Sequence, residues 1–98
     1  MPKYLVLWEV DPNKASVNPK ERGAAWTGML DMIKQDMKEG KVVDWGVCPG
    51  EARGYSIMMM PELDLAKNVQ RFYPFVTFKV NQVMTVDQTV ELAKSMSG

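Results

Sequence analysis

The sequence contains no histidine and a single cysteine, Cys48, and these two shortages limit its chemistry. Without histidine, the chain lacks the most common general base, the usual zinc and haem ligand, and any Ser-His or Cys-His nucleophile pair. A lone cysteine forms neither a disulfide within the chain nor a CxxC site. The residues therefore imply no metal site and no cofactor, and the low cysteine content favours a cytoplasmic protein.

The chain also lacks an excess of charge and a long hydrophobic run. Its 12 Lys and Arg residues balance its 12 Asp and Glu residues, whereas a nucleic-acid-binding domain normally carries a basic excess. The run Tyr4–Trp8 is ended by Glu9, well short of the roughly 20 apolar residues that a membrane helix needs. We therefore expect neither a nucleic acid nor a membrane as a partner.

What the chain does have is the composition of one globular domain. It has 98 residues, of which 46% are hydrophobic and 24% are charged. These values are close to the average for soluble domains, and the length suits one domain rather than two. Because no linker or repeat divides the chain, we expect residues 1–98 to form a single domain.

Hydrophobic spacing predicts seven elements. Alternating or branched residues predict strands at 3–10, 41–48, 54–60 and 75–84. Helical spacing predicts helices at 19–40, 61–73 and 85–95. Asn18 followed by Pro19 is a typical helix start, and Thr85 with Gln88 forms the pattern of a capping box.

The order β-α-β-β-α-β is that of the split βαβ, or ferredoxin-like, fold, here with an added C-terminal helix. The predicted fold class is therefore α+β. We expect a four-stranded antiparallel sheet with the spatial order 2-3-1-4. Two helices should cover one face of this sheet.

The alternation of side chains assigns the strand residues to the two faces. We place Trp8, Trp45 and Tyr55 on the face covered by helices, with Trp26 facing them. The predicted open face contains Leu5, Leu7, Glu9, Asp44, Gly46, Cys48, Ser56, Met58, Met60, Thr77, Lys79 and Asn81. This face mixes apolar residues, charges and small residues, which suits a partly polar cavity beneath a second subunit. Its candidate ligand-binding residues are Glu9, Asp44, Cys48, Ser56 and Lys79.

The sequence also resembles a known superfamily. The segment Tyr4–Glu9, the long helix with Trp26, the hairpin ending in Gly54–Ile57 and the strand entry Pro74-Phe75 are similar to the dimeric α/β-barrel superfamily, and within it to small prokaryotic domains of unknown function. The resemblance implies that two sheets pair face to face as a barrel. Members often hold a small molecule inside this barrel, and some are enzymes or bind haem. It transfers no catalytic residue, since several of those activities use a histidine.

The candidate residues also have structural interpretations. Cys48 is either a reactive thiol or an idle one. Glu9 and Asp44 are either a general acid and base or partners of Lys79 and Arg53 in ion pairs. The sequence leaves open whether the protein is an enzyme.

Two functional hypotheses follow from these observations. The first is a homodimer that binds a small molecule between or beneath its paired sheets. The alternative is a structural or regulatory interaction module without a ligand. An RNA-binding module of the same fold is disfavoured, because strand 54–60 lacks the exposed aromatic and basic pattern that such modules carry.

Overall fold

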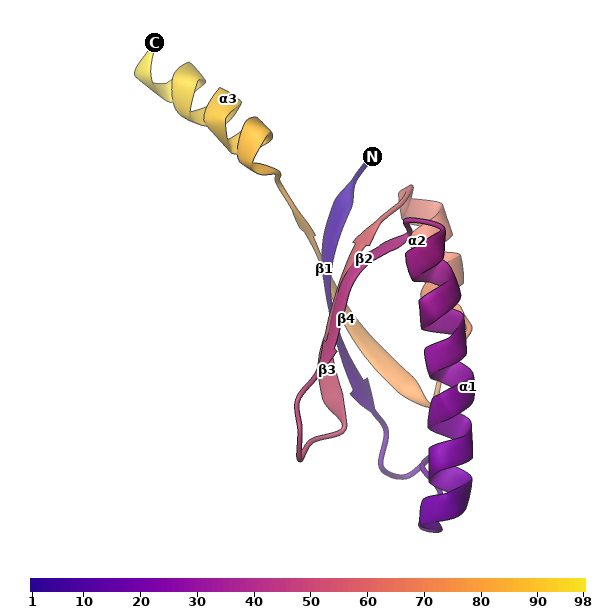
Figure 1. Cartoon of the computed structure of the whole chain (residues 1–98). Helices are drawn as coiled ribbons and strands as arrows, with labels where there is room; N and C mark the ends of the chain where they lie inside the picture. The colour runs from indigo at the N-terminus through magenta and orange to yellow at the C-terminus, as the bar shows by residue number, and fades with distance from the viewer.

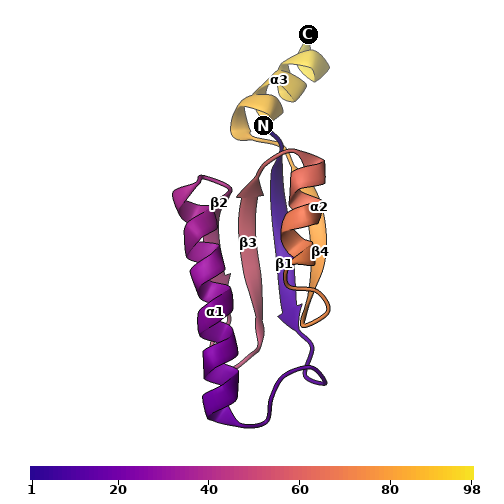
Figure 2. The ribbon, with the colours of Figure 1, turned by 90° about the vertical axis from the view of Figure 1, so that its right-hand side faces the viewer.

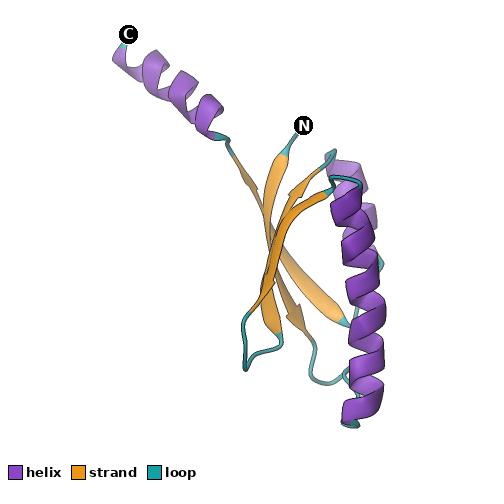
Figure 3. Ribbon diagram, in the orientation of Figure 1, coloured by secondary structure: helices purple, strands orange, loops and turns teal.

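The computed structural model describes residues 1–98 and contains four strands and three helices (Figures 1 and 3). The strands are β1 (Lys3–Val10), β2 (Val42–Val47), β3 (Arg53–Met59) and β4 (Val76–Val83). The helices are α1 (Pro19–Lys38), α2 (Glu62–Gln70) and α3 (Val86–Ser97). Every predicted element is therefore present, with ends that differ by a few residues, most at the C-terminal end of α2.

The strands form one antiparallel sheet in the order β2-β3-β1-β4, as the sequence predicted. Helices α1 and α2 lie on the same face of this sheet, and the other face is left open (Figure 1). Turned by 90°, α1 lies towards the β2 and β3 side and α2 towards the β1 and β4 side (Figure 2). The chain is thus α+β with ferredoxin-like order.

Helix starts follow the capping residues seen in the sequence. The side chain of Asn18 accepts hydrogen bonds from the backbone nitrogens of Lys20 and Glu21 at 2.9 and 3.4 Å. At α3, the Gln88 backbone donates to Thr85 Oγ1 at 3.2 Å, and the Thr85 backbone donates to Gln88 Oε1 at 2.9 Å. Because each cap satisfies backbone groups that the helix leaves free, these residues set where the helices begin.

Three indole rings occupy the space between the helices and the sheet. Trp8 stacks on Trp45 with ring centroids 5.3 Å apart, and Trp26 of α1 meets Trp8 edge-on at 6.4 Å. Trp8 Nε1 also donates a hydrogen bond to the carbonyl oxygen of Tyr55 at 3.2 Å. The prediction that Trp8 and Trp45 face the helices is therefore confirmed.

A buried carboxylate joins the two helices that cover the sheet. Asp36 of α1 is almost fully buried, and its Oδ2 accepts hydrogen bonds from Asn68 Nδ2 at 3.0 Å and from the guanidinium of Arg71. Because a buried charge is costly unless it is paired, this pairing fixes α1 relative to the end of α2.

The structure corrects the predicted faces of β3. Its register pairs Tyr4 with Met58 and Val6 with Ser56, so Ser56, Met58 and the following Met60 lie buried on the helix side. Tyr55 and its neighbours Ile57 and Met59 therefore lie on the open face instead.

The start of β2 needs a smaller correction. A register shift between Val42 and Asp44 turns Val42 into the core and leaves Val43 53% exposed, the reverse of the prediction. Such a bulge adds a residue to one strand, which changes the side on which the residues before it point. Trp45 beyond the shift faces the helices as predicted.

Helix α3 projects beyond the end of the sheet and contains no buried residue (Figures 1 and 2). It makes the molecule 60 Å long although its other two dimensions are 26 and 20 Å. No helix of the chain is both long enough and apolar enough to span a bilayer.

Candidate functional site on the open face

The open face of the sheet contains a hollow of about 530 Å³. It lies towards one end of the sheet, over the second half of β1, the start of β3 and the first half of β4, and it reaches Cys48 just after β2. The lining residues are Leu7, Trp8, Glu9, Cys48, Arg53, Gly54, Tyr55, Thr77, Phe78 and Lys79. In a single copy this hollow is open to solvent, whereas ligand pockets of about 300–1,000 Å³ enclose most of the ligand's surface.

Three of the five predicted site residues converge in this hollow. Glu9, Cys48 and Lys79 all line it. Leu7 pairs with Lys79 across β1 and β4, and Glu9 pairs with Thr77, so Glu9 and Lys79 are diagonal neighbours. The thiol of Cys48 is exposed at the end of β2, and it is free.

Asp44 lies beside the hollow and is linked to it through Tyr55. The Tyr55 hydroxyl donates a hydrogen bond to Asp44 Oδ2 at 2.8 Å. This bond raises the pKa of Tyr55 above its usual value of 10.0, because the phenol must keep its proton to donate, and partial desolvation adds to the effect. The tyrosine is therefore held as a neutral, oriented group at the rim.

The lack of a side chain at Gly46 makes room for the Tyr55 ring. A Cβ at position 46 would lie 2.5 Å from Tyr55 Cε1, closer than carbon atoms approach without displacement. The absence of a side chain thus lets the ring cross β2 towards Asp44. Gly46 and Tyr55 are register partners, which explains their contact.

The charges on the rim are unevenly paired. Arg53 Nε donates to Glu51 Oε2 at 2.7 Å, which raises the pKa of Arg53 and lowers that of Glu51. Lys79, Glu9 and Asp44 form no ion pair within the chain, so the predicted structural pairing is not found. The hollow therefore offers one free ammonium group and one free carboxylate above a leucine floor.

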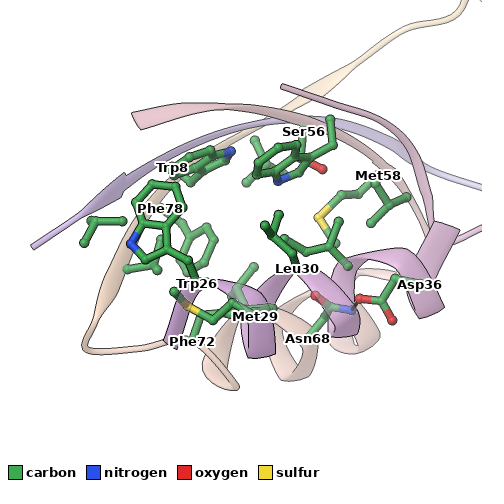
Figure 4. A pocket seen from close by; sticks show the side chains of 17 residues that line it. Trp8, Trp26, Met29, Leu30, Asp36, Ser56, Met58, Asn68, Phe72 and Phe78 are labelled. Carbon is green, nitrogen blue, oxygen red and sulfur yellow. Dashed lines mark hydrogen bonds between the residues drawn. The ribbon is translucent and has the colours of Figure 1, made fainter. Parts of the chain in front are cut away.

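Ser56 is the predicted site residue that lies elsewhere. It faces the helices and lines an inner cavity of about 60 Å³ between α1, α2 and the sheet (Figure 4). Its hydroxyl is buried and has no hydrogen-bond partner. The lining is almost entirely apolar. Ser56 is thus separated from the open face by the sheet itself.

With this geometry described, the chain can be compared with known proteins. A family model described as a domain of unknown function, DUF3303, matches residues 2–97. The chain belongs to the DUF3303 family. A search of curated proteins found no match. The family description supplies no activity, substrate or partner.

The sequence analysis missed two residues of this candidate site. Tyr55 was assigned to the helix side with the rest of its alternating set, and Arg53 was treated only as a partner for carboxylates. The signal that could have placed Tyr55 is the pair Gly54 and Ser56, because small residues on one side of a strand leave space for large rings beside them. A Cβ on Gly54 would lie 2.7 Å from Trp8 Cζ2.

Proposed function

We propose that two copies of the chain pair through their open sheet faces and hold a small molecule between them. The observation that carries this proposal is the hollow, which combines an apolar floor at Leu7 with the polar groups of Glu9, Tyr55 and Lys79. Ligand sites usually combine apolar walls with a few convergent polar groups. The paired arrangement corresponds to a dimeric α/β barrel.

The apolar content of the open face supports the pairing. Leu5, Leu7 and Ile57 lie near its centre, and Met59 lies at the end of the sheet beside Lys3. Leu7 remains 42% exposed in a single copy. Water-facing sheets normally carry polar residues there, so a second copy would remove this apolar area from water.

The open face carries both a positive and a negative side chain, so two copies of this face can be complementary in charge. Because β2 and β4 are the edges of the sheet, a two-fold axis that runs along the strands between two copies places β4 opposite β2 of the partner subunit. Lys79 is then one same-face position, roughly 7 Å along the strand, from Asp44 of the partner subunit. A lysine side chain spans this offset, so the free ammonium and the partner's carboxylate can meet at the rim.

The same axis places the two hollows opposite each other, because it preserves positions along the strands. The combined cavity has the apolar side chains of Leu7 on both walls and the polar groups of Glu9, Tyr55 and Lys79 around them. Such a lining suits an amphipathic small molecule with an apolar body and a hydrogen-bonding group.

Sedimentation equilibrium on matched variants tests this function. Leu7→Asp places a charge in the centre of the open face and is expected to give monomers that lose any bound molecule. Leu63→Asp is the control, since Leu63 is equally apolar and 64% exposed but lies on α2, on the other side of the sheet. Equal association of both variants and the wild type would contradict pairing through the open face. A Leu63→Asp chain that dimerises without any ligand would favour the interaction module instead.

A further inference from the structure

The inner cavity between the two covering helices and the sheet contains a buried hydroxyl group without a partner. Ser56 is 5% exposed, and its Oγ forms no hydrogen bond within the chain. A hydroxyl group can donate one hydrogen bond and accept two, and burying it unpaired is unfavourable. Most buried polar side-chain atoms are therefore paired. The Ser56 hydroxyl thus points to a hydrogen-bonding group that the chain itself does not supply.

The space beside Ser56 comes from the small residues of β3. Gly54 and Ser56 are the first two residues of this strand on the helix side. The indole ring of Trp8 fills the space over Gly54, where an added Cβ would lie 2.7 Å from Trp8 Cζ2. Over Ser56, the inner cavity of about 60 Å³ remains. One water needs roughly 10–15 Å³ of cavity, so this space is larger than a single water requires.

The other walls of the cavity suit an uncharged molecule. Most of its lining is hydrophobic, including Leu30 on the helix side, and Asp36 is the only charged residue in it (Figure 4). Asp36 and Asn68 lie together at one end of the cavity, and the carboxylate accepts hydrogen bonds from Asn68 and Arg71. Because Arg71 already neutralises this carboxylate, the cavity presents no unpaired charge to a ligand.

Helix α1 covers the cavity without sealing it. The cavity is partly open to solvent. The apolar residues of α1 that line it are all half-buried, and none is fully buried: Trp26, Met29, Leu30 and Ile33. A small molecule can therefore enter beneath α1 while the sheet and its hydrogen bonds stay intact.

We infer that the inner cavity is a second binding site, which takes a small uncharged molecule with an apolar body and one hydroxyl or carbonyl group that pairs with Ser56 Oγ. Short-chain alcohols and ketones belong to this class. An apolar cavity of about 150 Å³ accommodates benzene, so a cavity of about 60 Å³ takes only a few non-hydrogen atoms. The sheet separates this site from the hollow on the open face, and the inference does not depend on the pairing of two copies.

Methyl NMR of the methionines distinguishes the two sides of the sheet. Met29 and Met58 line the inner cavity, whereas Met59 lies on the open face. Titration with propan-2-ol is expected to shift the methyl signals of Met29 and Met58 until they saturate, and to leave that of Met59 unchanged. An unshifted Met58 signal, or equal shifts of Met58 and Met59, would overturn the inference.

Ser56→Ala separates the contribution of the hydroxyl from that of the cavity. The variant should bind propan-2-ol about threefold to tenfold more weakly, because one hydrogen bond is lost. Xenon needs only an apolar cavity, so it should bind the wild type and the variant equally. Equal affinity of the two proteins for propan-2-ol, or binding of xenon without binding of propan-2-ol, would overturn the assigned role of Ser56.

A matched pair of variants locates the bound probes. Leu30→Phe fills the cavity from α1 and should weaken the binding of propan-2-ol and xenon at least fivefold. Leu7→Asp changes the open face instead and should leave both affinities unchanged. Unchanged binding by Leu30→Phe, or loss of binding by Leu7→Asp, would overturn the inner site. A monomeric wild type that binds propan-2-ol at Met58 would support this inference and contradict the proposed function.

Discussion

Tyr55 reaches across β2 and donates its hydroxyl hydrogen to Asp44 Oδ2 at 2.8 Å. The ring lies over Gly46, where any side chain would collide with it. This pair defines the rim of the hollow on the open face. The lack of a side chain at Gly46 therefore determines where the hydroxyl group of Tyr55 lies.

Gly46→Ala is expected to displace the Tyr55 ring and break its bond to Asp44. The new Cβ would lie 2.5 Å from Tyr55 Cε1, so the ring must move. Because the pair is exposed, we expect the free energy of unfolding to fall by only about 1 kcal/mol. Urea denaturation gives this value, and the chemical shifts of the Tyr55 ring report its displacement.

Gly28→Ala is the matched control for that substitution. No atom lies within 4 Å of a Cβ added at Gly28, which is inside α1. Replacing glycine by alanine in a helix stabilises it by up to about 1 kcal/mol. If both variants changed stability in the same direction, the steric role of Gly46 would be wrong.

The Tyr55 hydrogen bond gives a defined pH dependence. Since the pKa of Tyr55 is raised above 10.0 in the folded chain, its contribution to stability is complete below pH 10 and is lost as the pH rises through the folded pKa. Asp44→Ala removes the acceptor, and the pKa of Tyr55 should fall back towards 10.0. Ultraviolet difference titration, with Tyr55→Phe to identify the signal, measures this. An unchanged titration in Asp44→Ala would show that the carboxylate does not hold the phenol.

Gly54→Ala should be far more damaging than Gly46→Ala. A Cβ at position 54 would overlap the carbonyl oxygen of Gly46 and lie 2.7 Å from Trp8 Cζ2. The backbone cannot yield without disturbing the pairing of β2 with β3, so we expect a loss above about 3 kcal/mol. Tryptophan fluorescence during urea unfolding tests this, because Trp8 stacks on Trp45. A loss no larger than that of Gly46→Ala would contradict the packing around Gly54.

Ser56→Ala should leave the free energy of unfolding unchanged or raise it by about 1 kcal/mol. The buried hydroxyl lacks a partner in an apolar cavity, and burying an unpaired polar group is unfavourable. Thermal unfolding of Ser56→Ala beside the exposed control Ser95→Ala measures the difference. A clear destabilisation by Ser56→Ala alone would mean that the hydroxyl is hydrogen-bonded within the cavity.

The sequence predicted the elements and the strand order, because each element carries strong local signals. Asn18 and Thr85 begin helices, and the hydrophobic period changes clearly between strands and helices. The same signals did not determine which side of β3 faces the helices, because both of its sides are apolar. Gly54 and Ser56 look like residues of an open cavity, yet they make room for indole rings inside the core.

The candidate site was predictable only in part for the same reason. Glu9, Cys48 and Lys79 come together because the side chains of β1, β2 and β4 alternate between the two faces of the sheet there, as their sequences predict. The contact of Tyr55 with Asp44 depends on register between strands, which alternation within one strand does not determine. The bulge at Val43 arises from the pairing of β2 with β3, and nothing in the sequence of β2 indicates it.

Native mass spectrometry of the freshly purified protein tests the central claim most directly. The account predicts a species of twice 11.1 kDa that carries an additional small mass, and Leu7→Asp should lose both the dimer and that mass. A wild-type monomer would contradict the account, because the open face would then not pair with a second copy.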